Sequence, residues 1–134
     1  MKAKVNPSLQ KKMTMLNQKA EEQVKDQLVK IAQFATTRSP VDTGAYVTSF
    51  SMKHSYSSGR GRTSNNKPRR QNPQAKRQEG LAQLLSDIET LKPLENPLVV
   101  LSNGSPHARQ VETGEGWNQT PGYAVFAQVR DKFR

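Results

Sequence analysis

The chain contains no cysteine, which excludes disulfide bonds, thiolate chemistry and cysteine-ligated zinc. A lack of cysteine fits a protein that is made in a reducing cytosol. No apolar run approaches the roughly 20 residues that a membrane-spanning helix needs. The lysines near the N-terminus are followed by no apolar segment of the signal-peptide type. We therefore expect neither a signal peptide nor a membrane span.

Apolar residues are scarce as well, at 33% of the 134 residues. A chain of this length has room for one domain with one modest core. We therefore expect a single domain over residues 1–134 in which much of the chain is surface or loop. We also expect neighbouring copies to complete part of the apolar burial.

Residue sets that carry catalysis or bind metals are missing too. The two histidines, His54 and His107, do not have the spacing of a metal site. The Gly-Arg-Gly-Arg run at 59–62 superficially suggests a phosphate-binding loop, but no Lys-Ser or Lys-Thr pair follows it. Three acids are too scattered for a catalytic pair: Asp42, Glu112 and Glu115. We expect no enzyme, no cofactor and no metal.

Acidic residues are absent between Asp42 and Glu79, and basic residues gather in this interval. The net charge of the chain is +10, of which the interval contributes +8 and the rest of the chain +2. The eight basic residues are Lys53, Arg60, Arg62, Lys67, Arg69, Arg70, Lys76 and Arg77. Residues 57–75 include none that anchors a core, so we expect a flexible basic segment at about 57–77.

Two roles are open for this basic segment. Cations that face phosphates release condensed counterions, which gives salt-dependent affinity for DNA. No aromatic residue lies between Tyr56 and Trp117 to stack on bases, so such binding would be blind to sequence. The alternative is an arm that docks on an acidic protein neighbour or a loop that is simply solvated. The candidate contact residues are Arg60, Arg62, Lys67, Arg69, Arg70, Lys76 and Arg77.

Apolar residues three and four apart predict two helices. The first stripe comprises Leu9, Met13, Leu16, Ala20, Val24, Leu28, Ile31 and Ala35. Ser8 is its candidate N-cap, and Pro40 ends the helix after Arg38 and Ser39. The second stripe comprises Leu81, Leu84, Leu85, Ile88 and Leu91, and Pro93 ends it.

Two strands are expected between and after these helices. A tight turn at Pro40–Gly44 precedes a strand in which alternate residues face the core: Tyr46, Thr48, Phe50, Met52, His54 and Tyr56. Leu98–Leu101 reads as a short buried strand that ends at Asn103 and Gly104. The pattern predicts an α+β fold, with a long N-terminal helix and a second helix packed on a small antiparallel sheet.

The C-terminal region shows two helix-start signals. Ser105 and Pro106 precede about two turns with Ala108 and Val111, and Gly114 stands in the C-terminal position. After a loop that carries Trp117, Thr120 and Pro121 repeat the signal. The residues that follow favour a helix, with a strand as the alternative: Val125, Phe126, Val129 and Phe133.

Taken in order, these motifs resemble the head–tail joining proteins of tailed bacteriophages, also called neck, tail-completion or minor tail proteins. The family pattern is a Pro-Val-Asp-Thr-Gly turn, a strand into asparagine, a Pro-Tyr-Ala step, a valine or leucine, a glutamate and a glycine, then a downstream Pro-Gly. The resemblance covers most of residues 8–52 and 96–134, whereas about 56–95 is unmatched. His107 stands where the family usually has tyrosine.

The resemblance implies a virion protein of the neck that assembles in the host cytoplasm as a homo-oligomeric ring. It would contact portal and adaptor proteins and the tail terminator or tail tube, with double-stranded DNA passing through the lumen. The implied motif and subunit-interface residues are Asp42, Thr43, Gly44, Asn103, His107, Ala108, Glu112, Gly114, Trp117, Pro121 and Gly122. The alternative function is that of a sequence-nonspecific nucleic-acid-binding protein.

Overall fold

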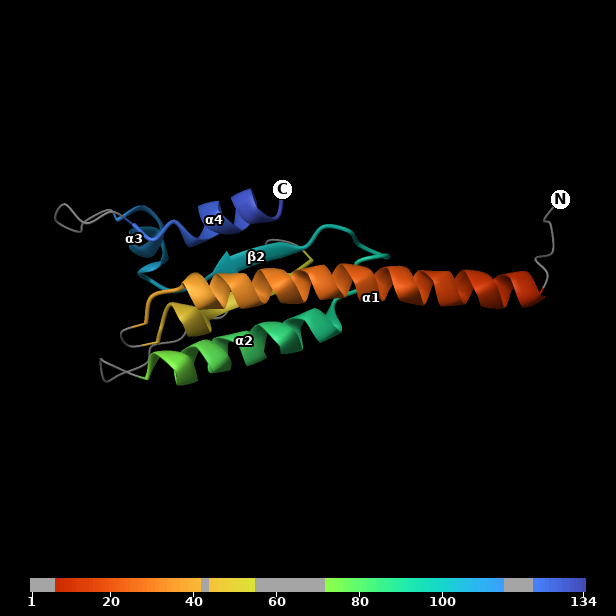
Figure 1. Ribbon diagram of the computed structural model, residues 1–134, viewed down its shortest axis with the longest axis horizontal. Helices are drawn as coiled ribbons and strands as arrows, with labels where there is room; N and C mark the ends of the chain where they lie inside the picture. Colours follow the sequence, from red (N-terminus) through yellow and green to blue (C-terminus); the bar gives the residue numbers. More distant parts are fainter. Residues whose placement is uncertain (1–6, 42–43, 55–71, 115–121) are drawn as a thin grey trace.

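The computed structural model describes residues 7–41, 44–54, 72–114 and 122–134. It confirms a fold of mixed helices and strands (Figure 1). The elements are, in chain order, helix α1 (Pro7–Arg38), the 3-10 helix η1 (Val47–Ser49), strand β1 (Phe50–Lys53), helix α2 (Pro73–Thr90), strand β2 (Val100–Asn103), helix α3 (Ala108–Thr113) and helix α4 (Val125–Lys132).

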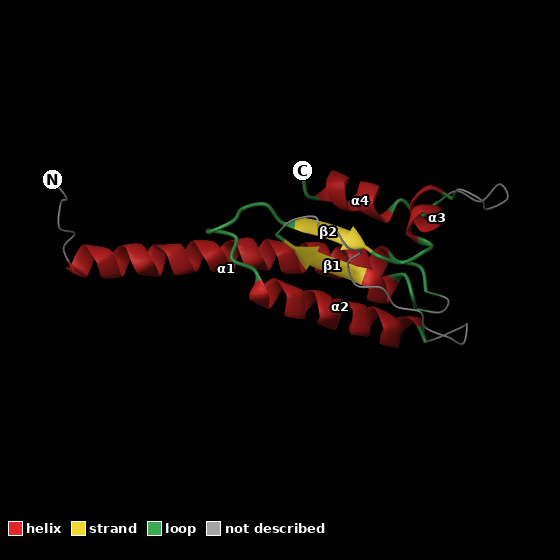
Figure 2. Ribbon diagram, turned by 180° about the vertical axis from the view of Figure 1, so that it is seen from behind, coloured by secondary structure: helices red, strands yellow, loops and turns green. Residues whose placement is uncertain are grey.

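Helix α1 is the longest element, and helices α2 and α4 pack against its C-terminal half. Helix α2 packs against it on one side and also contacts β1 and η1, whereas α4 packs on the other side of α1 (Figures 1 and 2). The two strands pair in antiparallel fashion, as predicted, and the register places Phe50 opposite Asn103 and Lys53 opposite Val100. The buried core draws on α1, β1, α2, α3 and α4 and on the residue before η1: Ala32, Ala35, Tyr46, Phe50, Met52, Leu84, Ile88, Leu91, Val111 and Val125.

The first strand is shorter than its alternating pattern predicts. Val47–Ser49 form a 3-10 helix, and the strand begins only at Phe50. The hydroxyls of Thr48 and Ser49 donate to backbone carbonyls four residues back, at Gly44 and Ala45, and such bonds compete with the extended backbone. The face expected to be exposed is therefore buried at Ala45, Val47, Ser49 and Ser51.

The boundaries of α1 and β2 also differ from the expectation. Helix α1 begins at Pro7, so Ser8 lies inside it and is not its N-cap; its end at Arg38 is as predicted. Strand β2 lies two residues later than the apolar run suggests, and Leu98 is 57% exposed. Its residues are half-buried, and α2 makes its main contacts with the sheet through β1.

Helix α2 begins earlier than expected, at Pro73. Asn72 is its N-cap, and the Oδ1 atom of this residue accepts a hydrogen bond from the backbone N of Ala75 at 3.0 Å. The basic segment therefore does not extend to residue 77, because Lys76 and Arg77 belong to α2.

The C-terminal segment is a helix, and the strand alternative is wrong. Helix α4 starts at Val125 after Ala124, which has a positive φ of 48°, so the helix does not follow directly on Thr120 and Pro121. Gly114 ends α3 with a φ of 76°, as its predicted position requires. Within the described parts of the chain, no helix combines the length and apolarity needed to cross a membrane.

Candidate functional site

The motif residues that the structure describes gather at one end of the molecule, where α1 ends and α3 begins (Figure 1). Asp42, Thr43, Trp117 and Pro121 lie outside the described residues. The others come together from distant parts of the chain: Gly44, Asn103, His107, Ala108, Glu112, Gly114 and Gly122.

Asn103 ties the end of β2 to the start of η1. Its Nδ2 atom donates to the backbone O of Tyr46 at 2.8 Å, and its Oδ1 atom accepts from the backbone N of Ser105 at 2.9 Å. The next backbone N, of Gly104, donates to the O of Ser49 at 3.0 Å. Both ends of the amide are thus used, so the asparagine of the motif has a structural role.

His107 and Ala108 form the start of α3. The Oγ atom of buried Ser105 accepts from the backbone N of His107 at 3.1 Å, which fixes the turn into the helix. The His107 side chain is exposed and makes no capping bond, whereas Ala108 packs at the edge of the core. His107 is therefore the described motif residue that is most accessible to another molecule.

Glu112 caps α4 from α3. Its two carboxylate oxygens accept from the backbone N atoms of Phe126 and Ala127, at 2.9 and 3.0 Å. These are two of the amides that a helix start leaves unpaired, and a negative charge there also suits the helix dipole. The motif glutamate thus joins two helices that are separated by residues 114–124.

Gly122 allows the chain to return against α3. A Cβ atom at this position would lie 2.4 Å from the backbone O of Glu112 and 2.5 Å from the N of Gly114. The backbone N atoms of Tyr123 and Ala124 donate to the O atoms of Val111 and Glu112, at 2.7 and 3.1 Å. Only glycine fits this close approach.

Tyr46 was expected only as a core residue, yet it lies at the centre of this motif cluster. Its ring packs edge-on against Phe50 at a centroid distance of 5.2 Å. Its buried hydroxyl has no hydrogen-bond partner among the described residues. Burial, and secondarily the negative charge of Glu112, raise the pKa of Tyr46 well above its ordinary value.

Two of the seven predicted basic contact residues have structural roles instead. The guanidinium of Arg77 donates to the backbone O of Ser39 at 3.0 and 3.2 Å, and so caps the end of α1. Lys76 pairs with Glu79 at 3.1 Å, and its side chain covers Gly44 so closely that a Cβ atom there would meet its Cδ at 2.7 Å. The other five lie outside the described residues: Arg60, Arg62, Lys67, Arg69 and Arg70.

The first part of α1 extends past the rest of the molecule (Figures 1 and 2). We call residues 8–19 the helical extension, and every one of them is exposed. The extension carries four large apolar side chains that are at least half exposed: Leu9, Met13, Met15 and Leu16. The sequence predicted the apolar stripe but not that this part of it lacks a cover.

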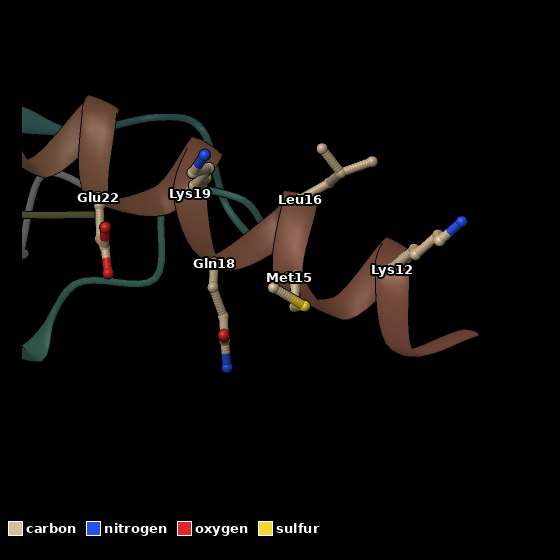
Figure 3. A pocket seen from close by; sticks show the side chains of 6 residues that line it. All are labelled: Lys12, Met15, Leu16, Gln18, Lys19 and Glu22. Carbon is tan, nitrogen blue, oxygen red and sulfur yellow. The ribbon is translucent and has the colours of Figure 1, made fainter. Parts of the chain in front are cut away.

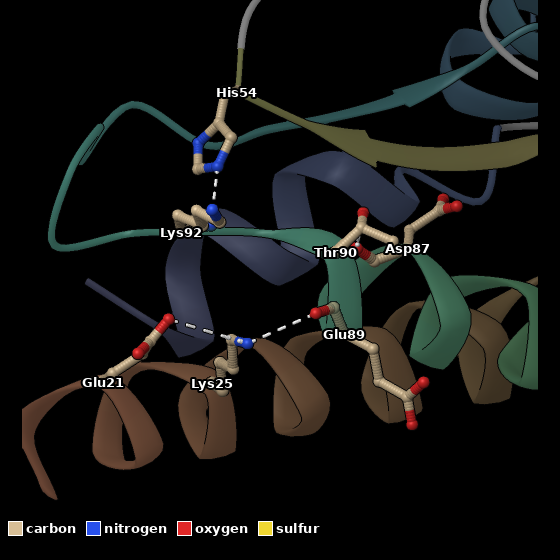
Figure 4. A network of polar contacts seen from close by, with 7 residues as sticks. All are labelled: Glu21, Lys25, His54, Asp87, Glu89, Thr90 and Lys92. Carbon is tan, nitrogen blue, oxygen red and sulfur yellow. Dashed lines mark hydrogen bonds and ion pairs between the residues drawn. The ribbon is translucent and has the colours of Figure 1, made fainter. Parts of the chain in front are cut away.

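A set of polar contacts marks the base of the extension (Figure 4). Lys25 of α1 pairs with Glu21 at 3.7 Å and donates to the backbone O of Glu89, at the end of α2, at 3.4 Å. Nearby, the Nε2 atom of His54 accepts from the backbone N of Lys92 at 2.8 Å. These contacts hold the end of α2 and the loop that follows it.

A second surface feature lies between α1 and α4. Phe34 and Phe133 meet edge-on at a centroid distance of 5.8 Å, and Arg38 and Lys132 lie over the Phe34 ring at 5.1 and 5.4 Å. The cations thus cover an aromatic pair that holds the C-terminal helix to α1.

The described residues contain no group of three His, Cys, Asp or Glu side chains that would hold a metal ion. Comparison of the chain with protein-family models, with curated proteins and with solved structures finds no match.

Proposed function

We propose that this chain is a structural protein of a tailed-phage neck. It forms a ring that joins the portal and adaptor of the head to the tail terminator or tail tube, and the genome passes through the lumen. The observation that supports this role best is the helical extension, an exposed helix with an apolar stripe that the described residues of its own chain leave uncovered.

Physical chemistry explains why such an extension favours assembly. Isolated helices of about 12–15 residues are marginal in water, so the extension gains little stability by itself. Burying one Leu or Met side chain contributes about 1.5–3 kcal/mol. A contact that covers Leu9, Met13 and Leu16 would therefore stabilise both the helix and the assembly.

The motif cluster supports the same proposal in a different way. Asn103, Glu112 and Gly122 fix the backbone of one end of the molecule through contacts between distant segments. A surface that is already rigid binds a neighbour at a smaller entropy cost. Exposed His107 lies on this rigid end, available to an adjacent protein of the neck.

Sequence-nonspecific nucleic-acid binding is the second candidate function. It is favoured by the five basic residues between Arg60 and Arg70, an interval without any acid. In a ring, the same charges would repeat in every copy and act on DNA in the lumen or on an acidic neighbour.

The neck proposal is tested in phage particles. Deleting the gene should leave packaged heads without tails in electron micrographs, and supplying the wild-type chain should restore complete particles. Leu16→Asp should fail to restore them because it places a charge in the apolar stripe. Gln18→Asp, on another side of the extension (Figure 3), should succeed. Normal tails in the absence of the protein would refute the proposal.

A further inference from the structure

We infer that the apolar side of the helical extension packs against the loop between α2 and β2, residues 91–99, of a second copy of this chain. The inference rests on the proposed ring function and names the contact between neighbouring subunits. Four observations support it: the direction of the stripe, its charge, the composition of the loop and the way the loop is held.

The direction of the stripe follows from helix geometry. At about 100° per residue, Leu9, Met13 and Leu16 fall within a sector of about 60°, and Phe34 falls in the same sector. Phe34 packs against Phe133 after α4. Near Phe34, the C-terminal region packs on this side of α1. Along the extension the same side of the helix is exposed, so a partner would pack on it there.

The charge of the extension indicates what kind of surface fits it. Residues 8–19 include Lys11, Lys12 and Lys19 and no acid. Lys12 and Leu16 point to the same side of the helix, whereas Gln18 and Glu22 point away from it (Figure 3). Two extensions packed on each other would gather lysines without an acidic partner, which is unfavourable. The matching surface is therefore apolar and acidic.

The loop between α2 and β2 holds one acid and one cation, Glu95 and Lys92, and together with Glu89 in the last turn of α2 it forms an apolar surface on which acids outnumber cations. Leu94 is 47% exposed and Leu98 is 57% exposed. Glu89 and Glu95 beside them are exposed, and neither makes an ion pair with the residues that the structure describes. Lys92 is the one cation in the interval 86–98. The chain thus carries both halves of a complementary contact, a basic apolar helix and an apolar surface, made by the end of α2 and the loop after it, with two acids against one cation.

The loop is also held in a defined shape. His54 accepts from the backbone N of Lys92, and its Nδ1 atom lies 3.3 Å from the backbone O of Leu98. The backbone N of Leu98 donates to Oδ1 of Asn96 at 3.2 Å. A preformed loop needs little ordering on binding. Because the two patches differ, the contact can repeat in one direction from copy to copy, and such head-to-tail contacts form a ring when the rotation closes.

Disulfide trapping tests this contact in the full-length chain, which has no cysteine of its own. Leu16→Cys and Leu98→Cys variants are mixed at high concentration, oxidised and separated without reductant. We expect a covalent dimer that contains one copy of each variant. Gln18→Cys mixed with Leu98→Cys is the matched control, and its yield should be at least about tenfold lower.

Other outcomes overturn the inference. Dimers of Leu16→Cys alone as the main product would show that two extensions pair with each other. No dimer in any mixture, together with a monomeric mass by sedimentation, would show that a different protein covers the extension. The neck proposal would survive both results, because particle assembly tests it separately.

Charge reversal gives an independent readout. The double variants Lys12→Glu/Lys19→Glu and Glu89→Lys/Glu95→Lys should each associate at least about tenfold more weakly than the wild type in sedimentation velocity. An equimolar mixture should regain association, because each reversed patch then meets a complementary one. A mixture as weak as its components would contradict the contact.

Discussion

At the scale of single residues, Tyr46 interacts with two motif residues although it is not part of the motif itself. Its backbone O accepts from Asn103, its ring packs on Phe50, and its hydroxyl is buried beside the charge of Glu112. Sequence reasoning placed Tyr46 on a buried face correctly, but as part of a strand. Nothing local indicates that the hydroxyl is left without a partner among the described residues.

Tyr46→Phe should therefore be neutral or stabilising by up to about 1 kcal/mol at pH 7, because it removes a buried polar atom that lacks a hydrogen bond. Burial raises the pKa of Tyr46, so the unfolded chain loses this proton at a lower pH than the folded chain does. The wild type should keep its full stability below about pH 10 and lose up to about 1.4 kcal/mol per pH unit above it from this group.

The measurement is urea unfolding of both proteins at a series of pH values from neutral to strongly alkaline. The difference in unfolding free energy should be constant below about pH 10 and should then move in favour of Tyr46→Phe. Parallel curves throughout would show that the folded protein ionises Tyr46 as readily as the unfolded chain.

At the scale of elements, the packing of α2 on η1 depends on one missing side chain. Gly80 is buried in the middle of α2, and a Cβ atom there would lie 2.3 Å from the backbone O of Val47. Helix α2 therefore approaches the backbone of η1 directly. The sequence places Gly80 inside a helix, where glycine is normally unfavourable, and only the neighbouring element explains it.

Gly80→Ala should lower the unfolding free energy by at least about 2 kcal/mol, although alanine has the higher helix propensity by about 1 kcal/mol. A backbone carbonyl has little room to move away, so η1 or α2 must shift. Gln78→Ala, at an exposed position of the same helix, is the control and should change stability by less than about 0.5 kcal/mol. Chemical denaturation of the wild type and the two variants measures these differences. Equal midpoints for all three proteins would disprove the close approach of α2 to the backbone of η1.

At the scale of the whole molecule, the basic residues that the sequence groups together have different roles. Lys76 and Arg77 serve α2 and α1, so that of the eight basic residues between Asp42 and Glu79 only Lys53 and the five from Arg60 to Arg70 are left for an external partner of this interval. The number of phosphates that this interval would neutralise on DNA is lower accordingly.

If the chain binds double-stranded DNA through this interval, the slope of log K against log salt should therefore be no steeper than about −5, since each phosphate contact contributes about −0.9. Arg69→Ala/Arg70→Ala should flatten the slope by about 2, and Lys76→Ala should leave it unchanged. Fluorescence anisotropy over a range of salt concentrations measures these slopes. If Lys76→Ala flattens the slope as much as the loss of one arginine does, Lys76 contacts the DNA. If the wild-type chain does not bind DNA even at low salt, nucleic-acid binding is excluded as the function.

The sequence by itself determined the local features: the two main helices, the end of α3 at Gly114 and the mixed α+β class. These features depend on interactions between residues within about four positions, such as apolar periodicity, proline sterics and positive φ at glycine. The alternating pattern wrongly predicted a strand at Thr48 and Ser49, because their hydroxyls bond to backbone carbonyls four residues back and these residues form a 3-10 helix.

The tertiary structure alone decided which residues meet. Arg77 lies 38 positions from Ser39, and Asn103 lies 57 positions from Tyr46, distances at which no sequence pattern specifies a contact. The tertiary structure also distinguished the covered part of α1 from the helical extension. In the sequence the two parts form one continuous apolar stripe, which looks the same whether this chain or another protein packs on it. Burial is a property of the assembled neighbours, and only packing determines it.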